Sequence, residues 1–293
     1  MGLVFGISSA FFFASSSILI RIGQRHRTGD DGVLMTVFMN VVALSIAAAL
    51  FASAPPFDAA GVVALLLGGL IGTVMGRSTN LRAVRHIGPS RASAFITGAP
   101  VVSAMVGWVV LGESLTLTEG LGGLLVVSGL LWLVKVRAGA RGVAAGESVP
   151  LRHYLIASAA PLFFGTAFVI RKWGLQRFDS SILGALLGAV AAFTVLVLID
   201  VVRGSIKERI AMNVTAIPWW FVGAGVATSF ALLSQFTAFG YLPAWVVGIL
   251  QATQGIWAIL LSVIFLKGDE RVDGALIGSV VLVVSGVVLI AVQ

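Results

Sequence analysis

Apolar runs of about 20 residues recur along nearly the whole chain, and this feature constrains the fold more than any other. A run of that length crosses the hydrocarbon core of a bilayer as one α-helix. Of the 293 residues, 58% are hydrophobic and 11% are Asp, Glu, Lys or Arg, whereas about 25% of a soluble domain is charged. We therefore expect a multi-pass protein of the plasma (inner) membrane, with the lipid bilayer as a partner. The first run has no basic segment before it, so we expect no cleaved signal peptide.

Ten of the runs are long enough to be transmembrane helices. Most are uninterrupted rather than alternating in polarity, which favours helices over barrel strands because the bilayer core offers backbone groups no water. We predict an all-α membrane protein with ten transmembrane helices, at residues 3–22, 33–53, 61–81, 90–111, 118–136, 153–173, 181–202, 217–240, 244–266 and 274–292.

The two halves of the sequence resemble each other at three places, in the same order. Each half has an aromatic-rich run that leads to a basic residue and a glycine, then an amide residue before an alanine and a proline, and finally Val-Val-Ser-Gly. Three matches in one order indicate an internal repeat. The matching segments are residues 11–15 and 162–166, 80–83 and 235–238, and 126–129 and 283–286.

Each repeat holds five predicted spans, so the second repeat must be inverted in the membrane relative to the first. The predicted architecture is therefore two inverted five-helix repeats, at residues 1–137 and 152–293, joined by a linker at residues 138–151. Inverted repeats are common in secondary transporters, whose substrate site lies where the repeats face each other.

Several short motifs resemble one known family. They are Ala-Val-Arg-His-Ile-Gly-Pro-Ser-Arg-Ala-Ser at residues 83–93, Pro100, Leu-Gly-Glu-Ser-Leu at residues 111–115, and a glycine-rich run at residues 120–129. With these motifs, the chain resembles the drug/metabolite transporter superfamily in its ten-helix, EamA-like branch. The resemblance covers the whole chain, because the second half carries a weaker copy, and it implies a secondary transporter.

In the family that the chain resembles, the Gly-Glu pair that contains Glu113 is a hallmark of this position. Glu270 lies at the corresponding position after the ninth span. For both residues, a hydrogen bond that connects helices is favoured over a role in proton relay.

Loop charge and the family resemblance imply different orientations. The loops after the odd-numbered spans hold most of the Lys and Arg residues, and the even-numbered loops have one basic cluster, made of Arg171, Lys172 and Arg177. The positive-inside rule then places the odd-numbered loops in the cytoplasm and both termini outside. The resembling family is usually described with both termini in the cytoplasm. The orientation stays open at this point, with the charges favoured.

Arg77 is the one basic residue well inside a predicted span, and an ionisable residue there is a candidate for function. Its side chain either extends towards the interface near Arg82 or faces a central cavity. In the second case, Arg77 and Asn80 lie three residues apart on one helix face and would suit a carboxylate or phosphate group.

Polar residues on other spans are further candidates for substrate binding. Gln251, Gln254 and Trp257 follow one another at three-residue steps, so they share one face of the ninth span. Amides in lipid are costly, so these either bond to other helices or line the substrate path. Weaker candidates of the same kind are Asn40, Thr97, Gln235 and Tyr241.

Pro100 lies inside the fourth predicted span. A proline there is expected to kink the helix and free a backbone carbonyl. The kink is either structural or a hinge for gating.

Missing groups narrow the function further. No Asp or Glu lies in the middle of a predicted span, which disfavours export of cationic drugs in exchange for protons. The chain has no cysteine and no phosphate-binding loop, so we expect no metal, no organic cofactor and no enzymatic activity. The formal charge of +7 fits loops that face anionic lipid, and no nucleic-acid partner is expected.

The sequence thus predicts a secondary transporter that moves a small metabolite across the plasma membrane by alternating access. The substrate is expected to be neutral, zwitterionic or anionic, such as an amino acid or a related compound. The alternative is a membrane-embedded enzyme or lipid-handling protein, for which only Arg82, Arg85 and Arg91 come close to a suitable cluster. A polar cavity between the halves would favour transport, whereas a lipid-lined pocket containing those arginines would favour the alternative. A homo-oligomer is compatible with the sequence, which does not decide the oligomeric state.

Overall fold

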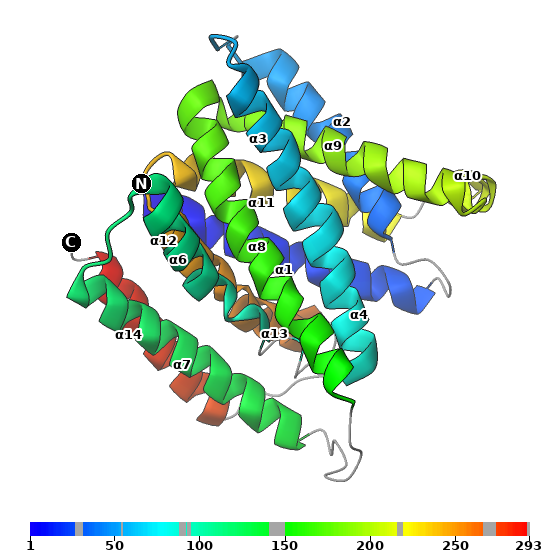
Figure 1. The fold of residues 1–293 in the computed structure, drawn as a ribbon. Coiled ribbons are helices and arrows are strands. Elements are labelled where there is room, and N and C mark those ends of the chain that lie inside the picture. The colour runs from blue at the N-terminus through cyan, green and yellow to red at the C-terminus, as the bar shows by residue number, and fades with distance from the viewer. Residues whose placement is uncertain are drawn as a thin grey trace.

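The computed structural model describes residues 1–26, 32–53, 55–87, 92, 95–140, 150–215, 219–265 and 274–291. All regular elements within these ranges are helices (Figure 1). Eight helical segments of the described chain are long and apolar enough to cross a membrane, and two more apolar helices, Ala99–Leu111 and Ile277–Ile290, are shorter. The prediction of an all-α membrane protein is confirmed.

The helices fall into two sets of five spans. The first set contains α1 (Gly2–His26), α2 (Val33–Phe51), the continuous segment of α3 (Ala59–Gly69), η1 (Leu70–Gly76) and α4 (Arg77–Ile87), α6 (Ala99–Leu111) and α7 (Leu117–Ala140). The second set contains α8 (Leu151–Phe178), α9 (Ser181–Val202), α11 (Trp219–Phe239), the pair α12 (Ala244–Ala252) and α13 (Gln254–Phe265), and α14 (Gly274–Ala291).

Two spans depart from a regular α-helix in their middle. In the third span, η1 is a π-helical segment between α3 and α4. In the ninth span, α12 ends at Thr253, whose hydroxyl donates to the carbonyl of Leu250 at 2.6 Å, and α13 begins at the next residue. Irregular backbone at membrane depth is tolerated where it is buried in protein or lines a cavity. Both irregular segments therefore point to the centre of the molecule as the place to look for a site.

The third, fourth and sixth spans differ from the prediction, and the third continues as α4 to Ile87, beyond the predicted end at residue 81. The fourth span does not run unbroken from residue 90, because α6 begins at Ala99, after a turn at Thr97 and Gly98. Pro100 stands in the first turn of α6, where a helix has no use for the missing N–H, so it starts the helix instead of kinking it. Helix α8 continues to Phe178, beyond the predicted end at residue 173. A helix that was not predicted, α10 (Ile206–Thr215), follows α9.

The helices of the two sets pack in a crossed arrangement. The first span of each set contacts the third span of the other, because α1 packs on α11 and α8 packs on α3. The second spans α2 and α9 contact each other, as do the fourth spans α6 and α12. The fifth spans α7 and α14 lie side by side at the lower left of Figure 1. This reciprocal pairing is what two inverted repeats related by an approximate two-fold axis produce.

Small residues allow the paired helices to approach closely. At the contact of α7 with α14, a Cβ on Gly122 would lie 2.7 Å from the carbonyl oxygen of Gly286. A Cβ on Gly286 would lie 2.5 Å from the carbonyl oxygen of Gly122. Backbone atoms cannot turn aside as a side chain does, so this pair of glycines sets the separation of the two helices.

We predict that Gly286→Ala destabilises the protein, because the added methyl group forces α7 and α14 apart. The expected cost is about 1–3 kcal/mol, as for overpacking elsewhere. Thermal unfolding of the detergent-purified protein measures the effect as a fall in Tm of several degrees. The matched control on the same helix is Gly274→Ala, since a Cβ at Gly274 meets nothing within 4 Å. An equal Tm for the two variants would contradict the close contact.

Candidate functional site

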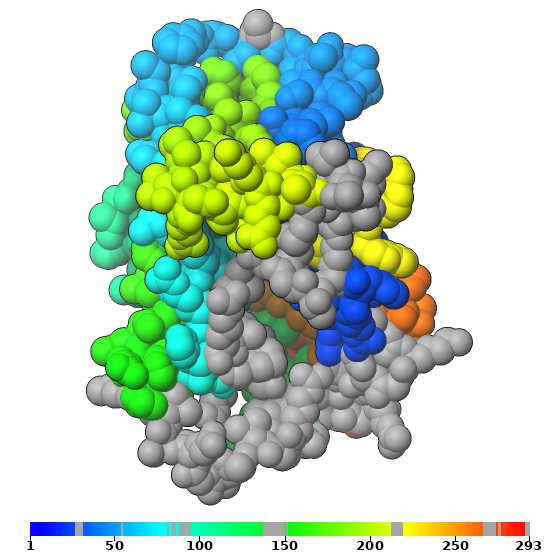
Figure 2. All heavy atoms as spheres, turned by 90° about the vertical axis from the view of Figure 1, so that its right-hand side faces the viewer, coloured from blue at the N-terminus to red at the C-terminus, as the bar shows by residue number. Residues whose placement is uncertain are grey.

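A cavity of about 280 Å³ lies between the two sets of helices. Residues of α1, α2, η1, α4 and α6 line it from the first set, and residues of α8, α11, α12 and α13 line it from the second. Figure 2 shows the surface hollowed between α4, α10 and the C-terminal end of α1, with part of the α12–α13 segment visible in the depth. The cavity therefore faces the end of the molecule at which α1 finishes.

Most of the polar residues expected at a binding site lie around this cavity. Arg77 and Asn80 line it from α4, which favours the cavity-facing interpretation of Arg77. The other expected residues in the lining are Asn40, Gln235, Gln251, Gln254 and Pro100.

Three expected residues lie elsewhere. Thr97 is buried, with 8% of its surface exposed, but is not part of the cavity lining. Trp257 packs edge-to-face on Phe11 with ring centroids 5.5 Å apart. Tyr241 is 63% exposed at the connection from α11 to α12. The three-residue spacing placed Trp257 on the same side of the helix as Gln251 and Gln254. It lies at the edge of that side, where it contacts α1 instead of lining the cavity.

A chain of amide and hydroxyl groups follows one wall of the cavity. The side-chain amide of Gln235 donates to Oε1 of Gln251 at 3.3 Å, and that of Gln251 donates to Oε1 of Gln254 at 3.2 Å. Gln254 in turn donates to the hydroxyl of Ser17 at 3.1 Å, and Ser9 donates to Oε1 of Gln251 at 2.9 Å. The glutamines thus both line the cavity and connect α1, α11, α12 and α13.

Arg171, on α8, begins this chain and is the main residue that the sequence analysis missed. Its Nη1 donates to Oε1 of Gln235 at 3.1 Å, its Nε to the carbonyl of Gly68 at 3.1 Å, and its Nη2 to Oγ1 of Thr73 at 3.4 Å. The side chain is 6% exposed and lines the cavity. Arg171 therefore joins the third span of one repeat to the third span of the other.

The space for this guanidinium exists because the facing helix carries glycines. A Cβ on Gly68 would lie 2.6 Å from Cγ of Arg171, and one on Gly72 would lie 2.6 Å from its Nη2. The sequence analysis counted Arg171 among the basic residues of a loop. The signal that could have found the residue is the apolar stretch after Lys172, which includes Leu175 and Phe178 and extends the helix.

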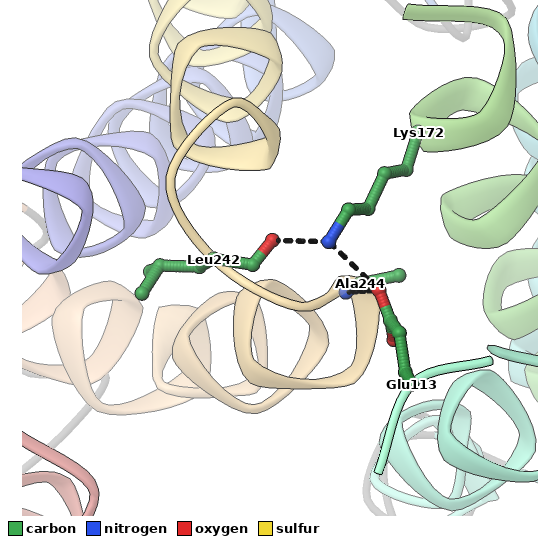
Figure 3. A network of polar contacts seen from close by, with 4 residues as sticks. All are labelled: Glu113, Lys172, Leu242 and Ala244. Carbon is green, nitrogen blue, oxygen red and sulfur yellow. Dashed lines mark hydrogen bonds and ion pairs between the residues drawn. The ribbon is translucent and has the colours of Figure 1, made fainter. Parts of the chain in front are cut away.

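The next residue along α8, Lys172, forms a buried ion pair (Figure 3). Its Nζ lies 2.8 Å from Oε1 of Glu113, and the two side chains are 12% and 8% exposed. Nζ also donates to the carbonyl of Leu242, and the backbone N–H of Ala244 donates to the same Oε1, both at 2.8 Å. Glu113 thus connects the end of α6 to α8 and to the start of α12. Glu270 lies outside the described residues.

A second pocket of about 400 Å³ lies on the other side of Lys172. Lys172, Gln176 and Tyr241 are among the residues that line it. Between this outer pocket and the central cavity lie Phe168 and Phe239, with ring centroids 6.2 Å apart, of which the first lines the cavity and the second lines the outer pocket. We call Phe168, Phe239 and the Glu113–Lys172 pair the partition.

The orientation argument from charge also changes. Arg171 and Lys172 are inside α8, and Arg177 is in its last turn, so the basic cluster assigned to an even-numbered loop is not a loop cluster. Arg25, Arg82 and Lys135 on the odd-numbered side lie inside helices as well, so the bias keeps its direction.

Comparison with known proteins gives a family. The profile of the EamA-like transporter family matches residues 1–135 and 151–292. A protein of known crystal structure superposes on the chain with a TM-score of 0.74, covering 99% of this chain and 96% of its own, at 16% sequence identity. That identity shows a shared fold and nothing finer. No curated protein matches the sequence.

We predict that Glu113→Gln and Lys172→Met each destabilise the protein, because each leaves the other member of the buried pair without its counter-charge. Loss of one partner costs about 3–5 kcal/mol in buried pairs, while replacing both is often nearly neutral. Thermal unfolding of both variants and of the double variant measures the coupling, and the double variant is expected to lose less than the sum.

Glu208→Gln is the control, since Glu208 is exposed on α10. Additive losses in the double variant would show that Glu113 and Lys172 do not stabilise each other.

Proposed function

The chain belongs to the EamA-like transporter family, and from this premise we propose that it is a secondary transporter of a small metabolite in the plasma membrane. The observation that carries the proposal is the cavity between the repeats, whose lining includes Arg77, Asn80, Gln235, Gln251 and Gln254. A polar cavity at the meeting of inverted repeats is where such proteins bind their substrates. Of the arginines on which the enzyme or lipid-handling alternative depended, Arg82 is exposed and is not a lining residue, while the side chains of Arg85 and Arg91 lie outside the described part of the chain.

Alternating access supplies the mechanism of the proposal. The central cavity faces one end of the molecule, and the partition separates it from the outer pocket at the other. Transport would require the side chains of the partition to separate while the hollow shown in Figure 2 closes. The irregular backbone of η1 and of Thr253 lies beside the cavity and offers places where the helices can bend without breaking regular hydrogen bonds. Pro100, at the start of α6, is a further candidate hinge.

Direction follows from the charge bias. Arg21 and Arg25 lie near the C-terminal end of α1, Lys207 and Arg209 lie on α10, and both elements border the hollow. By the positive-inside rule, we propose that the cavity faces the cytoplasm in this conformation and that both termini lie outside.

We predict that a thiol placed in the cavity becomes reactive from each side of the membrane in turn. The chain contains no cysteine, so Ser17→Cys, which changes an exposed cavity residue, gives a single reporter. A membrane-impermeant thiol reagent is expected to label it in inside-out vesicles and, more slowly, in right-side-out vesicles.

Combining Ser17→Cys with Glu113→Gln is expected to raise labelling from the right-side-out direction, because that change weakens the partition. Gln176→Cys, in the outer pocket, is the control for that side. Labelling of Ser17→Cys from one side only, with or without Glu113→Gln, would exclude alternation through this cavity.

Arg77→Ala is expected to reduce transport at least tenfold while the protein remains folded, because it removes a charged donor from the cavity. The measurement is exchange of labelled amino acids and organic acids into proteoliposomes preloaded with the same compounds. Arg82→Ala is the matched control, five residues further along α4, exposed and outside the cavity lining. Normal exchange by Arg77→Ala would contradict a role for Arg77 in substrate binding and would favour a side chain that only extends towards the interface.

A further inference from the structure

We propose that the substrate is a small organic anion whose carboxylate binds Arg171, and that it carries no ammonium group. The inference rests on the proposed transport function and narrows its substrate class. Four observations support it: the partners of Arg171, the contrast with Lys172, the charges around the cavity and its apolar wall.

Arg171 has a buried charge that only neutral groups contact. Its three hydrogen-bond acceptors are a backbone carbonyl, a side-chain amide and a hydroxyl, on Gly68, Gln235 and Thr73. The ion pairs that the structure describes contain no carboxylate on this guanidinium. A guanidinium has five N–H groups, so two remain for a ligand. A charge buried without a counter-charge is costly, and an anion that enters the cavity would remove that cost.

The contrast with the adjacent residue is informative. Lys172, one position along α8, has Glu113 as its counter-ion. The fold therefore provides a carboxylate for the cation at the partition but none for the cation that faces the cavity. Arg171 must be charged in any case, because a guanidinium is not deprotonated in proteins.

The rest of the lining favours an anion over a zwitterion or a cation. None of the residues described as lining the cavity is Asp or Glu. A second guanidinium, that of Arg77, lines the cavity four residues beyond Thr73, which is about one helical turn. Among the described lining side chains, an ammonium group would find amide and hydroxyl oxygens as acceptors but no carboxylate.

Apolar side chains in the lining suit the apolar part of such a molecule. Phe13, Phe164, Phe168, Ile96 and Pro100 line the cavity. Its volume of about 280 Å³ is at the lower end of the roughly 300–1,000 Å³ typical of ligand pockets. The site therefore fits a monocarboxylate with a compact aromatic or branched aliphatic body.

Two sets of probes with matched skeletons test the charge preference. The aromatic set is 3-phenylpropanoate, phenylalanine, 3-phenylpropanamide and 2-phenylethylamine, and the aliphatic set is 4-methylpentanoate, leucine, 4-methylpentanamide and 3-methylbutylamine. Thermal shift of the purified full-length protein ranks the binding within each set. In at least one set, the carboxylate is expected to bind about tenfold or more tightly than its amide, amino acid and amine. The absence of this preference in both sets, or no binding of either carboxylate, would overturn the proposal.

A charge variant then tests whether Arg171 is the binding group while leaving this residue in place. Thr73→Asp puts a carboxylate where a hydroxyl lies 3.4 Å from Nη2 of Arg171. This internal counter-ion is expected to raise the Tm of the ligand-free protein and to lower the affinity for the carboxylate probes at least tenfold. The matched neutral variant, Thr73→Asn, is expected to bind the carboxylate probes more tightly than the amide probes. Unchanged carboxylate affinity in Thr73→Asp would overturn the assignment to Arg171.

Exchange in proteoliposomes separates this inference from the function on which it rests. Saturable exchange of an amino acid or amine, but of no carboxylate, would overturn the substrate class and leave the transporter intact. Labelling of Ser17→Cys from one side only would overturn the transport mechanism itself, whichever probe binds.

Discussion

The burial of the Arg171 guanidinium at the junction of the two repeats is the constraint on which the centre of the structure depends. A charge at that depth is costly, so the protein supplies acceptors for three of its five N–H groups. Gly68 and Gly72 lack side chains where the guanidinium lies, and Gln235 accepts from it. The need to satisfy Gln235 in turn extends the polar chain to Gln251 and beyond. One buried cation thereby accounts for Gly68 and Gly72 and for the chain of glutamines along the cavity.

Consecutive residues of α8 serve opposite sides of the partition. Arg171 faces the central cavity, while Lys172 lines the outer pocket and binds Glu113. Because the two side chains project from one rigid helix, a movement of α8 that disturbs the ion pair also moves the guanidinium in the cavity. This coupling gives a physical route by which substrate binding at Arg171 and opening at Lys172 would influence each other.

The site could be predicted from the sequence to a large extent, but only where spacing along one helix was enough. Asn80 lies three residues from Arg77, and Gln254 lies three from Gln251, so each pair shares a face, and all four line the cavity. The same spacing gave a wrong prediction for Trp257. Residues at the edge of a helix face can contact a neighbouring helix instead of the cavity, and spacing alone does not say which. Arg171 was missed because it was counted with the basic cluster after the sixth span, and the acceptors that make its burial possible come from other helices.

The sequence by itself determined the number and order of the spans and the inversion of the repeats. Length and hydropathy are local properties, and an odd number of spans per repeat fixes the inversion. The crossed pairing of α1 with α11 and of α8 with α3 was decided only in the tertiary structure, as were the partners of Arg171 and Lys172. The physical reason is that nearly all faces of these helices are apolar, so hydropathy cannot say which of them meet. Close contacts between small residues and the pairing of buried polar groups make that choice.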